Sequence, residues 1–94
     1  MELLFEWDED KADANLRKHK IGFDEARSIF ADLNSVTIFD PQHSVDEERF
    51  IDIGMSSSGR LLVVVYTERA ERIRIISCRK ATSAEEKQYE RNKS

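Results

Sequence analysis

The most regular hydrophobic pattern lies between residues 49 and 80, where three strand-like segments are separated by two short polar turns. Residues 49–55 alternate apolar and polar positions, as a half-buried strand does. Residues 61–66 are apolar on both faces, which predicts a central strand that is covered on both sides. Residues 72–80 form the third segment. Short turns between consecutive strands predict an antiparallel meander.

The N-terminal part combines a short strand with a helical pattern. Leu3–Trp7 predicts a strand, and Asp8 follows as a helix N-cap with two acidic residues behind it. Residues 11–19 predict a helix with a narrow apolar stripe of Ala12 and Leu16. We expect this stripe to pack on the sheet.

Three further elements complete the predicted fold. Gly22 interrupts the first helix, and spacings of three and four predict a second one over Phe23, Ala26, Ile29 and Phe30. Residues 36–39 predict a strand. Thr82 and Glu85 form a capping box that begins a last helix, residues 84–91. The resulting order, β-α-α-β-β-β-β-α, predicts an α+β fold with two N-terminal helices packed on an antiparallel sheet and a C-terminal helix.

Size and composition set the frame for this fold. Ninety-four residues predict a single domain, 1–94. The lone Cys78 excludes an internal disulfide, and no Cys/His cluster has zinc-ligand spacing, so neither a metal nor a cofactor is expected. The start, MELLFEWDED, lacks the features of a signal peptide, and residues 61–66 are far too short for a membrane helix of about 20 residues. These features predict a cytoplasmic protein without a membrane partner.

Charge is distributed unevenly along the chain. The net charge of −4 argues against a general nucleic-acid binder. Residues 1–59 carry six basic and fourteen acidic side chains, whereas residues 60–94 carry nine basic and five acidic ones. A phosphate-binding face is therefore expected to be local and largely confined to the C-terminal strands.

The segment 72–80, RIRIISCRK, combines core-like isoleucines with four cations. Regular alternation places Arg74 and Arg79 on opposite faces unless the strand is bulged between them. An arginine here either grips a phosphate, or it snorkels from the sheet edge or pairs with Glu68 or Glu71. We assign Arg79, at the end of the strand, to the phosphate and Arg74 to a structural or partner contact.

Two other polar clusters contain a histidine. Lys18 and His19 end the first helix, where a protonated imidazole is favoured and could transfer protons, although both residue types are common in a last helical turn. His43, Glu48 and Arg49 bring together the groups that metal-free phosphodiester cleavage needs. A solvated loop with surface ion pairs is the alternative.

Three aromatic residues carry a polar atom, and bases of single-stranded RNA stack on such rings. Trp7 and Tyr66 lie on or beside predicted strands, so core packing is the simpler interpretation for both. Tyr89 lies on an otherwise polar helix and is the strongest candidate for such a contact. That helix is either loosely docked or requires a partner.

A resemblance to a known family runs from about Phe5 to Tyr89. Its motifs read FEWDEDKADANLRKHKIGFDEA, DPQHSVDEERFIDIG, GRLLVVVYTER and RIRIISCRKAT with a trailing YE. In this order and spacing they resemble the BrnT family of toxins from bacterial type II toxin-antitoxin pairs. The resemblance implies a small RelE-like fold, a metal-independent endoribonuclease that blocks translation, and neutralisation by a BrnA-like ribbon-helix-helix antitoxin. Operator DNA would be contacted only through the antitoxin, and RNA would be cut free or on the ribosome.

The resemblance also implies a set of site residues. Its characteristic positions match Trp7, Lys18, His19, Glu48, Arg49, Arg74, Ser77, Arg79 and Tyr89. One departure is Lys20, because the family often has glycine directly after the Lys-His pair.

Two hypotheses follow for function. In the first, an endoribonuclease, the catalytic residues are His19, Glu48, Arg49 and Arg79, and the RNA-binding residues are Trp7, Lys18, His43, Arg74, Ser77, Lys80 and Tyr89. Arg79 and Arg49 would bind the scissile phosphate, and Glu48 or His19 would transfer the proton. In the second, the protein is a non-catalytic interaction module whose arginines bind an acidic partner.

Overall fold

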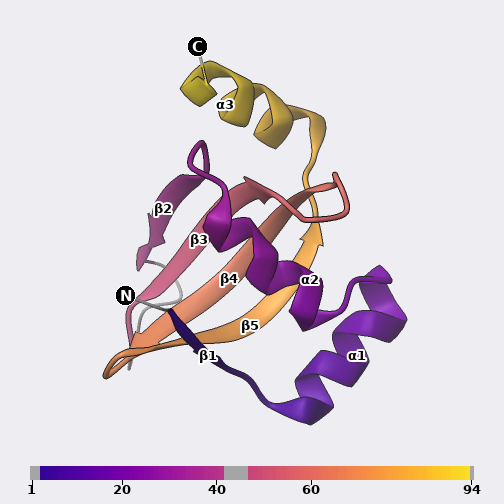
Figure 1. The fold of residues 1–94 in the computed structure, drawn as a ribbon, viewed down its shortest axis with the longest axis vertical. Coiled ribbons are helices and arrows are strands. Elements are labelled where there is room, and N and C mark those ends of the chain that lie inside the picture. Colours follow the sequence, from indigo (N-terminus) through magenta and orange to yellow (C-terminus); the bar gives the residue numbers. More distant parts are fainter. Residues whose placement is uncertain (1–2, 42–46, 94) are drawn as a thin grey trace.

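A five-stranded sheet forms the centre of the structure, a computed structural model that describes residues 3–41 and 47–93 (Figure 1). The strands are β1 (Leu4–Glu6), β2 (Val36–Asp40), β3 (Arg49–Met55), β4 (Leu61–Arg69) and β5 (Arg72–Lys80). The helices are α1 (Glu9–His19), α2 (Phe23–Ser28) with the short 3-10 helix η1 (Ile29–Ala31) behind it, and α3 (Ser83–Lys93). The α+β class is confirmed.

The strands are arranged in the order β1-β5-β4-β3-β2, so β4 is central, as its two apolar faces predicted. Strands β2 to β5 pair antiparallel, but β1 pairs parallel to β5. The prediction of a wholly antiparallel sheet is therefore wrong at β1. No hairpin joins β1 to β5, so the turn geometry that sets strand direction in the meander does not apply to it.

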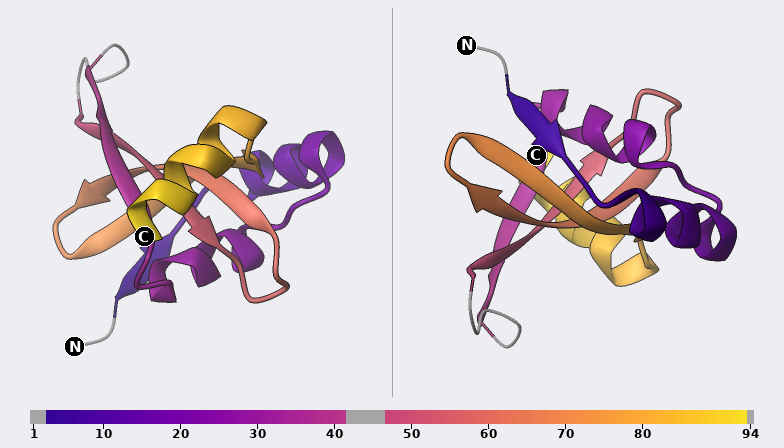
Figure 2. Two further views of the ribbon diagram at one scale, coloured as in Figure 1. Left: turned by 90° about the horizontal axis from the view of Figure 1, so that it is seen from above. Right: turned by 90° about the horizontal axis from the view of Figure 1, so that it is seen from below.

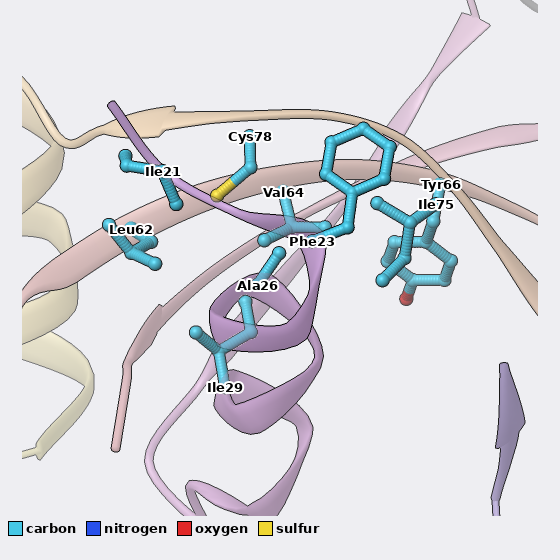
Figure 3. Close-up of a cluster of buried hydrophobic side chains, with 9 residues drawn as sticks. All are labelled: Ile21, Phe23, Ala26, Ile29, Leu62, Val64, Tyr66, Ile75 and Cys78. Carbon is cyan, nitrogen blue, oxygen red and sulfur yellow. The ribbon is translucent and has the colours of Figure 1, made fainter. Parts of the chain in front are cut away.

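The two faces of the sheet carry different helices (Figure 2). Helix α2 and η1 cover one face, and the main core packs beneath them (Figure 3), with Ile21, Phe23, Ala26, Ile29, Leu62, Val64, Tyr66, Ile75 and Cys78. On the opposite face, Ile53 and Val63 pack against Tyr89 of α3. We call this second side of the sheet the α3 face.

Helix α1 packs against the edge of β5 through a polar residue. Asn15 is buried; its side-chain amide donates to the carbonyl oxygen of Ile21 at 3.0 Å and its Oδ1 accepts from the backbone N–H of Cys78 at 3.0 Å. Leu16, in contrast, is 51 % exposed, so the prediction that it packs on the sheet is wrong. The edge of a strand presents backbone groups that need hydrogen-bond partners, and an amide supplies both a donor and an acceptor.

The helix ends follow their sequence signals. Asp8 Oδ1 accepts from the N–H groups of Asp10 and Lys11, and Thr82 and Glu85 form the reciprocal bonds of the capping box. Lys20 ends α1 in the left-handed conformation, with φ 61° and ψ 30°, and its N–H donates to the carbonyl of Leu16. The position where the family often has glycine is thus occupied by a residue in a glycine-type conformation.

Replacing Lys20 by glycine is expected to stabilise the fold by about 0.5–1 kcal/mol, because glycine adopts positive φ without the steric penalty of a Cβ. Urea unfolding followed by circular dichroism measures the gain. Lys20→Ala is the matched control, since it removes the long side chain but keeps the Cβ. A gain of equal size in both variants would show that the side chain, not the backbone conformation, carries the penalty.

Candidate functional site

A bulge in β5 decides which of its cations share a face. Val65 of β4 lies opposite Ser77, and the next residue, Tyr66, lies opposite Ile75, so Ile76 has no partner on β4. The extra residue reverses the alternation of side chains along β5. In agreement, Ile75 and Cys78, three residues apart, belong to the same core cluster.

Arg74, Ser77 and Arg79 consequently lie on the same face. Ser77 and Arg79 are opposite Val65 and Val63, and Arg74 is opposite Thr67. Val63 packs against Tyr89, which identifies this side as the α3 face. Regular alternation, which separates Arg74 from Arg79, is therefore a wrong prediction for this strand.

Strand β3 adds Arg49 to the same face. Arg49 is opposite Thr67, which places Arg49, Thr67 and Arg74 in one row across β3, β4 and β5. Arg79 is opposite Val63, and Val63 lies four residues from Thr67 along β4, a distance of about 13 Å. Arg49 thus shares its row with Arg74 and lies far from Arg79, an arrangement that does not support a joint grip of Arg49 and Arg79 on one phosphate.

Arg79 is oriented by the last helix. Its two terminal nitrogens donate to the Glu85 carboxylate at 2.7 and 2.8 Å. The hydrogen bonds from Arg79 lower the pKa of the Glu85 carboxyl to about 2, so this pair is charged at neutral pH. Lys80 lies opposite Leu62, a residue of the core beneath α2, and so it points away from the α3 face.

Arg74 and Arg69 are also bonded to carboxylates. Arg74 Nη1 donates to Glu6 of β1 at 2.8 Å, and not to Glu68 or Glu71 as one interpretation of the sequence had it. Arg69 donates to both oxygens of Glu47 at 2.6 and 2.7 Å. Because β1 and β5 are far apart in the sequence, the pairing of Arg74 with Glu6 carried no local signal.

Lys18 and His19 are brought next to β5. They line a shallow pocket of about 220 Å³ together with Ser77, Ile76, Lys11, Ala14 and Asn15. The pocket joins the basic end of α1 to the bulge. Two separately predicted clusters, the Lys-His pair and Ser77, are therefore neighbours in the structure.

The remaining candidates are spread over the molecule. Trp7 packs edge-on against Phe23, with 5.9 Å between the ring centroids, and its Nε1 donates to Glu9. These contacts agree with a packing role. Tyr89 is 2 % exposed and its hydroxyl donates to Asp32 at 2.6 Å. The prediction that RNA bases stack on Tyr89 is wrong for this structure, because the ring is buried between α3 and the sheet.

Glu48 and His43 belong to the segment before β3. Glu48 is exposed directly before Arg49. His43 lies outside the described residues. Within residues 3–41 and 47–93, no group of three or more His, Cys, Asp or Glu side chains could hold a metal ion, and no helix is long and apolar enough to cross a membrane.

Strongly shifted pKa values elsewhere have structural causes. Hydrogen bonds from Arg60 lower the pKa of Glu25 to about 2, in an ion pair that ties the β3–β4 turn to α2. Burial raises the pKa of Asp52, which accepts a hydrogen bond from Tyr66 at 2.9 Å, and raises the pKa of Cys78 to about 12. None of these groups lies with the arginines of the α3 face.

Comparisons with known proteins agree with the resemblance. The family described as "Ribonuclease toxin, BrnT, of type II toxin-antitoxin system" matches residues 7–85. Among solved structures, the fold is similar to the 1.1 Å crystal structure of the Brucella abortus ribonuclease toxin BrnT, with a TM-score of 0.63 and 21 % identity over 87 % of this chain and 100 % of that chain. No curated protein matches the sequence. The family match spans most of the chain and the similar structure has the same fold, so the protein belongs to the BrnT family of ribonuclease toxins of type II toxin-antitoxin systems.

Proposed function

We propose that the protein is a metal-independent endoribonuclease that cleaves RNA and thereby inhibits translation. The observation that carries the proposal is the bulge in β5, which gathers Arg74, Ser77 and Arg79 on one face of the sheet. Guanidinium groups held in fixed positions stabilise the extra negative charge of a phosphorane transition state. The family resemblance also leads us to propose that the fold is of the RelE-like type.

The proposed reaction is attack of a ribose 2′-hydroxyl on the neighbouring phosphorus. A base takes the proton of that hydroxyl, the 5′-oxygen leaves with a proton from an acid, and a 2′,3′-cyclic phosphate remains. Arg79 would stabilise the phosphorane. His19 shares a pocket with Ser77 beside β5, which supports His19 rather than Glu48 as the proton-transfer group near Arg79.

An antitoxin partner follows from the family. We propose a BrnA-like ribbon-helix-helix protein in the cytoplasm, which would inhibit by covering the arginines of the α3 face and would provide the only contact with operator DNA. Free RNA is proposed to be a weaker substrate than RNA presented by the ribosome. The acidic first half of the chain supports this, because it weakens nonspecific attraction of nucleic acid.

The rival function is a non-catalytic interaction module that binds an acidic partner. One observation favours it: Arg69, Arg74 and Arg79 are each bonded to a carboxylate of the chain itself. The same surface would accept acidic side chains from another protein. The arginines would then be binding hot spots and not catalytic groups.

The deciding experiment incubates the purified protein with RNA in the presence of EDTA. We expect fragments that end in a 2′,3′-cyclic phosphate, and no cleavage of the same RNA with 2′-O-methyl groups, which lacks the attacking hydroxyl. A requirement for divalent metal would contradict the mechanism. Failure to cut both free and ribosome-bound message would favour the interaction module.

A further inference from the structure

Thr67 is buried in the middle of the cationic row of the α3 face, and its hydroxyl is unusual. The side chain is 2 % exposed, and in the part of the chain that the structure describes, Oγ1 is the one buried side-chain oxygen or nitrogen without a hydrogen-bond partner. Leaving a buried hydroxyl unpaired destabilises a fold. A bound ligand or an ordered water would supply the missing partner.

The neighbours of Thr67 indicate the charge of that ligand. Arg49 lies directly opposite on β3 and Arg74 directly opposite on β5. Side chains that are directly opposite have Cβ atoms about 4.5–5.5 Å apart. The hydroxyl therefore lies between the bases of two arginine side chains. A guanidinium offers five N–H donors, and Arg74 gives one of its five to Glu6.

An anion already occupies this neighbourhood. The Glu47 carboxylate is bonded to Arg69, and its pKa is lowered first by the hydrogen bonds from Arg69 and then by the charges of Arg69, Arg74 and Arg49. One carboxylate thus lies within the field of three guanidinium groups. The same field would hold the oxygens of a phosphate.

We propose that Arg49, Thr67 and Arg74 form a phosphate-binding subsite for the RNA backbone, separate from the place where Arg79 acts. The two rows are four residues apart along β4, about 13 Å, so they would hold different phosphates of the same strand. The guanidinium groups supply charge. The Thr67 hydroxyl, which is covered in the free protein, donates a directional hydrogen bond to a phosphate oxygen once the side chains that cover it move aside. The ligand class rests on the proposed RNA-cleaving function, whereas the subsite rests on the geometry of the row.

The test is Thr67→Val, which removes the hydroxyl at nearly constant shape. The expected result is a combination: a melting temperature equal to or above that of the wild type, because an unpaired buried hydroxyl is lost, and affinity for a single-stranded 2′-O-methyl RNA weakened about 10-fold or more, because a charge-assisted hydrogen bond is lost. Thr67→Ser, which keeps the hydroxyl, should retain most of the affinity. Fluorescence anisotropy at one fixed salt concentration measures binding.

Three outcomes would overturn the subsite. Unchanged RNA affinity in Thr67→Val would remove the hydroxyl from the interface. A clear loss of stability would show that the hydroxyl has a partner within the protein. Thr67-dependent binding of an acidic peptide, with no binding of RNA, would replace the phosphate by carboxylates. Should the valine variant fail to fold, Thr67→Ala gives the same binding readout.

The uncleavable RNA keeps this test apart from that of the proposed function. Thr67-dependent binding of 2′-O-methyl RNA by a protein that does not cut ordinary RNA would leave the subsite in place and remove the endonuclease. Cleavage of ordinary RNA by the wild type, together with unchanged binding and cleavage in Thr67→Val, would support the endonuclease and remove the subsite.

Discussion

Substitution of Arg79 by alanine is expected to lower the rate of RNA cleavage by about 100-fold or more, since a guanidinium that stabilises transition-state charge contributes on this scale. Arg79 lies on the α3 face and is oriented by two hydrogen bonds to Glu85. Single-turnover cleavage of RNA in EDTA, with enzyme in excess, measures the chemical step.

The loss has to be separated from disturbance of α3, because Arg79 also connects β5 to that helix. Glu85→Gln is the matched control: it breaks the same ion pair but leaves the guanidinium in place. We expect this variant to cleave at a rate much closer to that of the wild type, with a comparable change in melting temperature. Equal losses in both variants would reduce Arg79 to a structural residue, and wild-type cleavage in Arg79→Ala would exclude it from the mechanism.

The second large effect is on stability and concerns Asn15. Asn15→Leu is expected to lower the free energy of unfolding by about 3 kcal/mol, because it leaves the N–H of Cys78 and the carbonyl of Ile21 buried without partners. For a domain of this size the loss corresponds to a decrease in Tm of roughly 12–24 °C. Urea or thermal unfolding measures it, and the Cys78 amide should exchange its hydrogen faster.

Leu16→Ala is the control on the same helix. For this variant, the sequence pattern predicts a large loss of stability and the structure predicts a small one. The apolar pattern makes Leu16 the packing residue, whereas the structure leaves its side chain half exposed. We therefore expect a change below about 1 kcal/mol for Leu16→Ala. A larger loss for Leu16→Ala than for Asn15→Leu would show that α1 docks through its apolar stripe after all.

The secondary structure was accessible from sequence wherever its cause is local. The cap at Asp8 and the capping box at Thr82 and Glu85 depend on residues within three or four positions of one another. The two short turns between β3, β4 and β5 likewise determine an antiparallel meander. The parallel pairing of β1 was not accessible, since it depends on contacts between segments far apart in the chain.

For the candidate site, the sequence supplied residue types and the tertiary structure their neighbours. Lys18, His19 and Ser77 were named from motifs, but only packing of α1 on the edge of β5 brings them to one pocket. Tyr89 was misjudged because the polar helix around it conceals the one side that packs on the sheet. Thr67 carries no signal in a strand of apolar residues, and it stands out only once its hydroxyl is seen to be buried without a partner.

By itself, the sequence determined that this chain is a small α+β domain of the BrnT family with an excess of cations in its last strands, because hydrophobic periods, caps and motifs are properties of short segments. The tertiary structure alone decided that Arg74 and Arg79 share a face with Arg49. That result depends on Ile76, which lies between Ile75 and Ser77 on β5 and has no partner on β4. A bulge arises from the pairing of two strands, and alternation counted along one strand cannot reveal it.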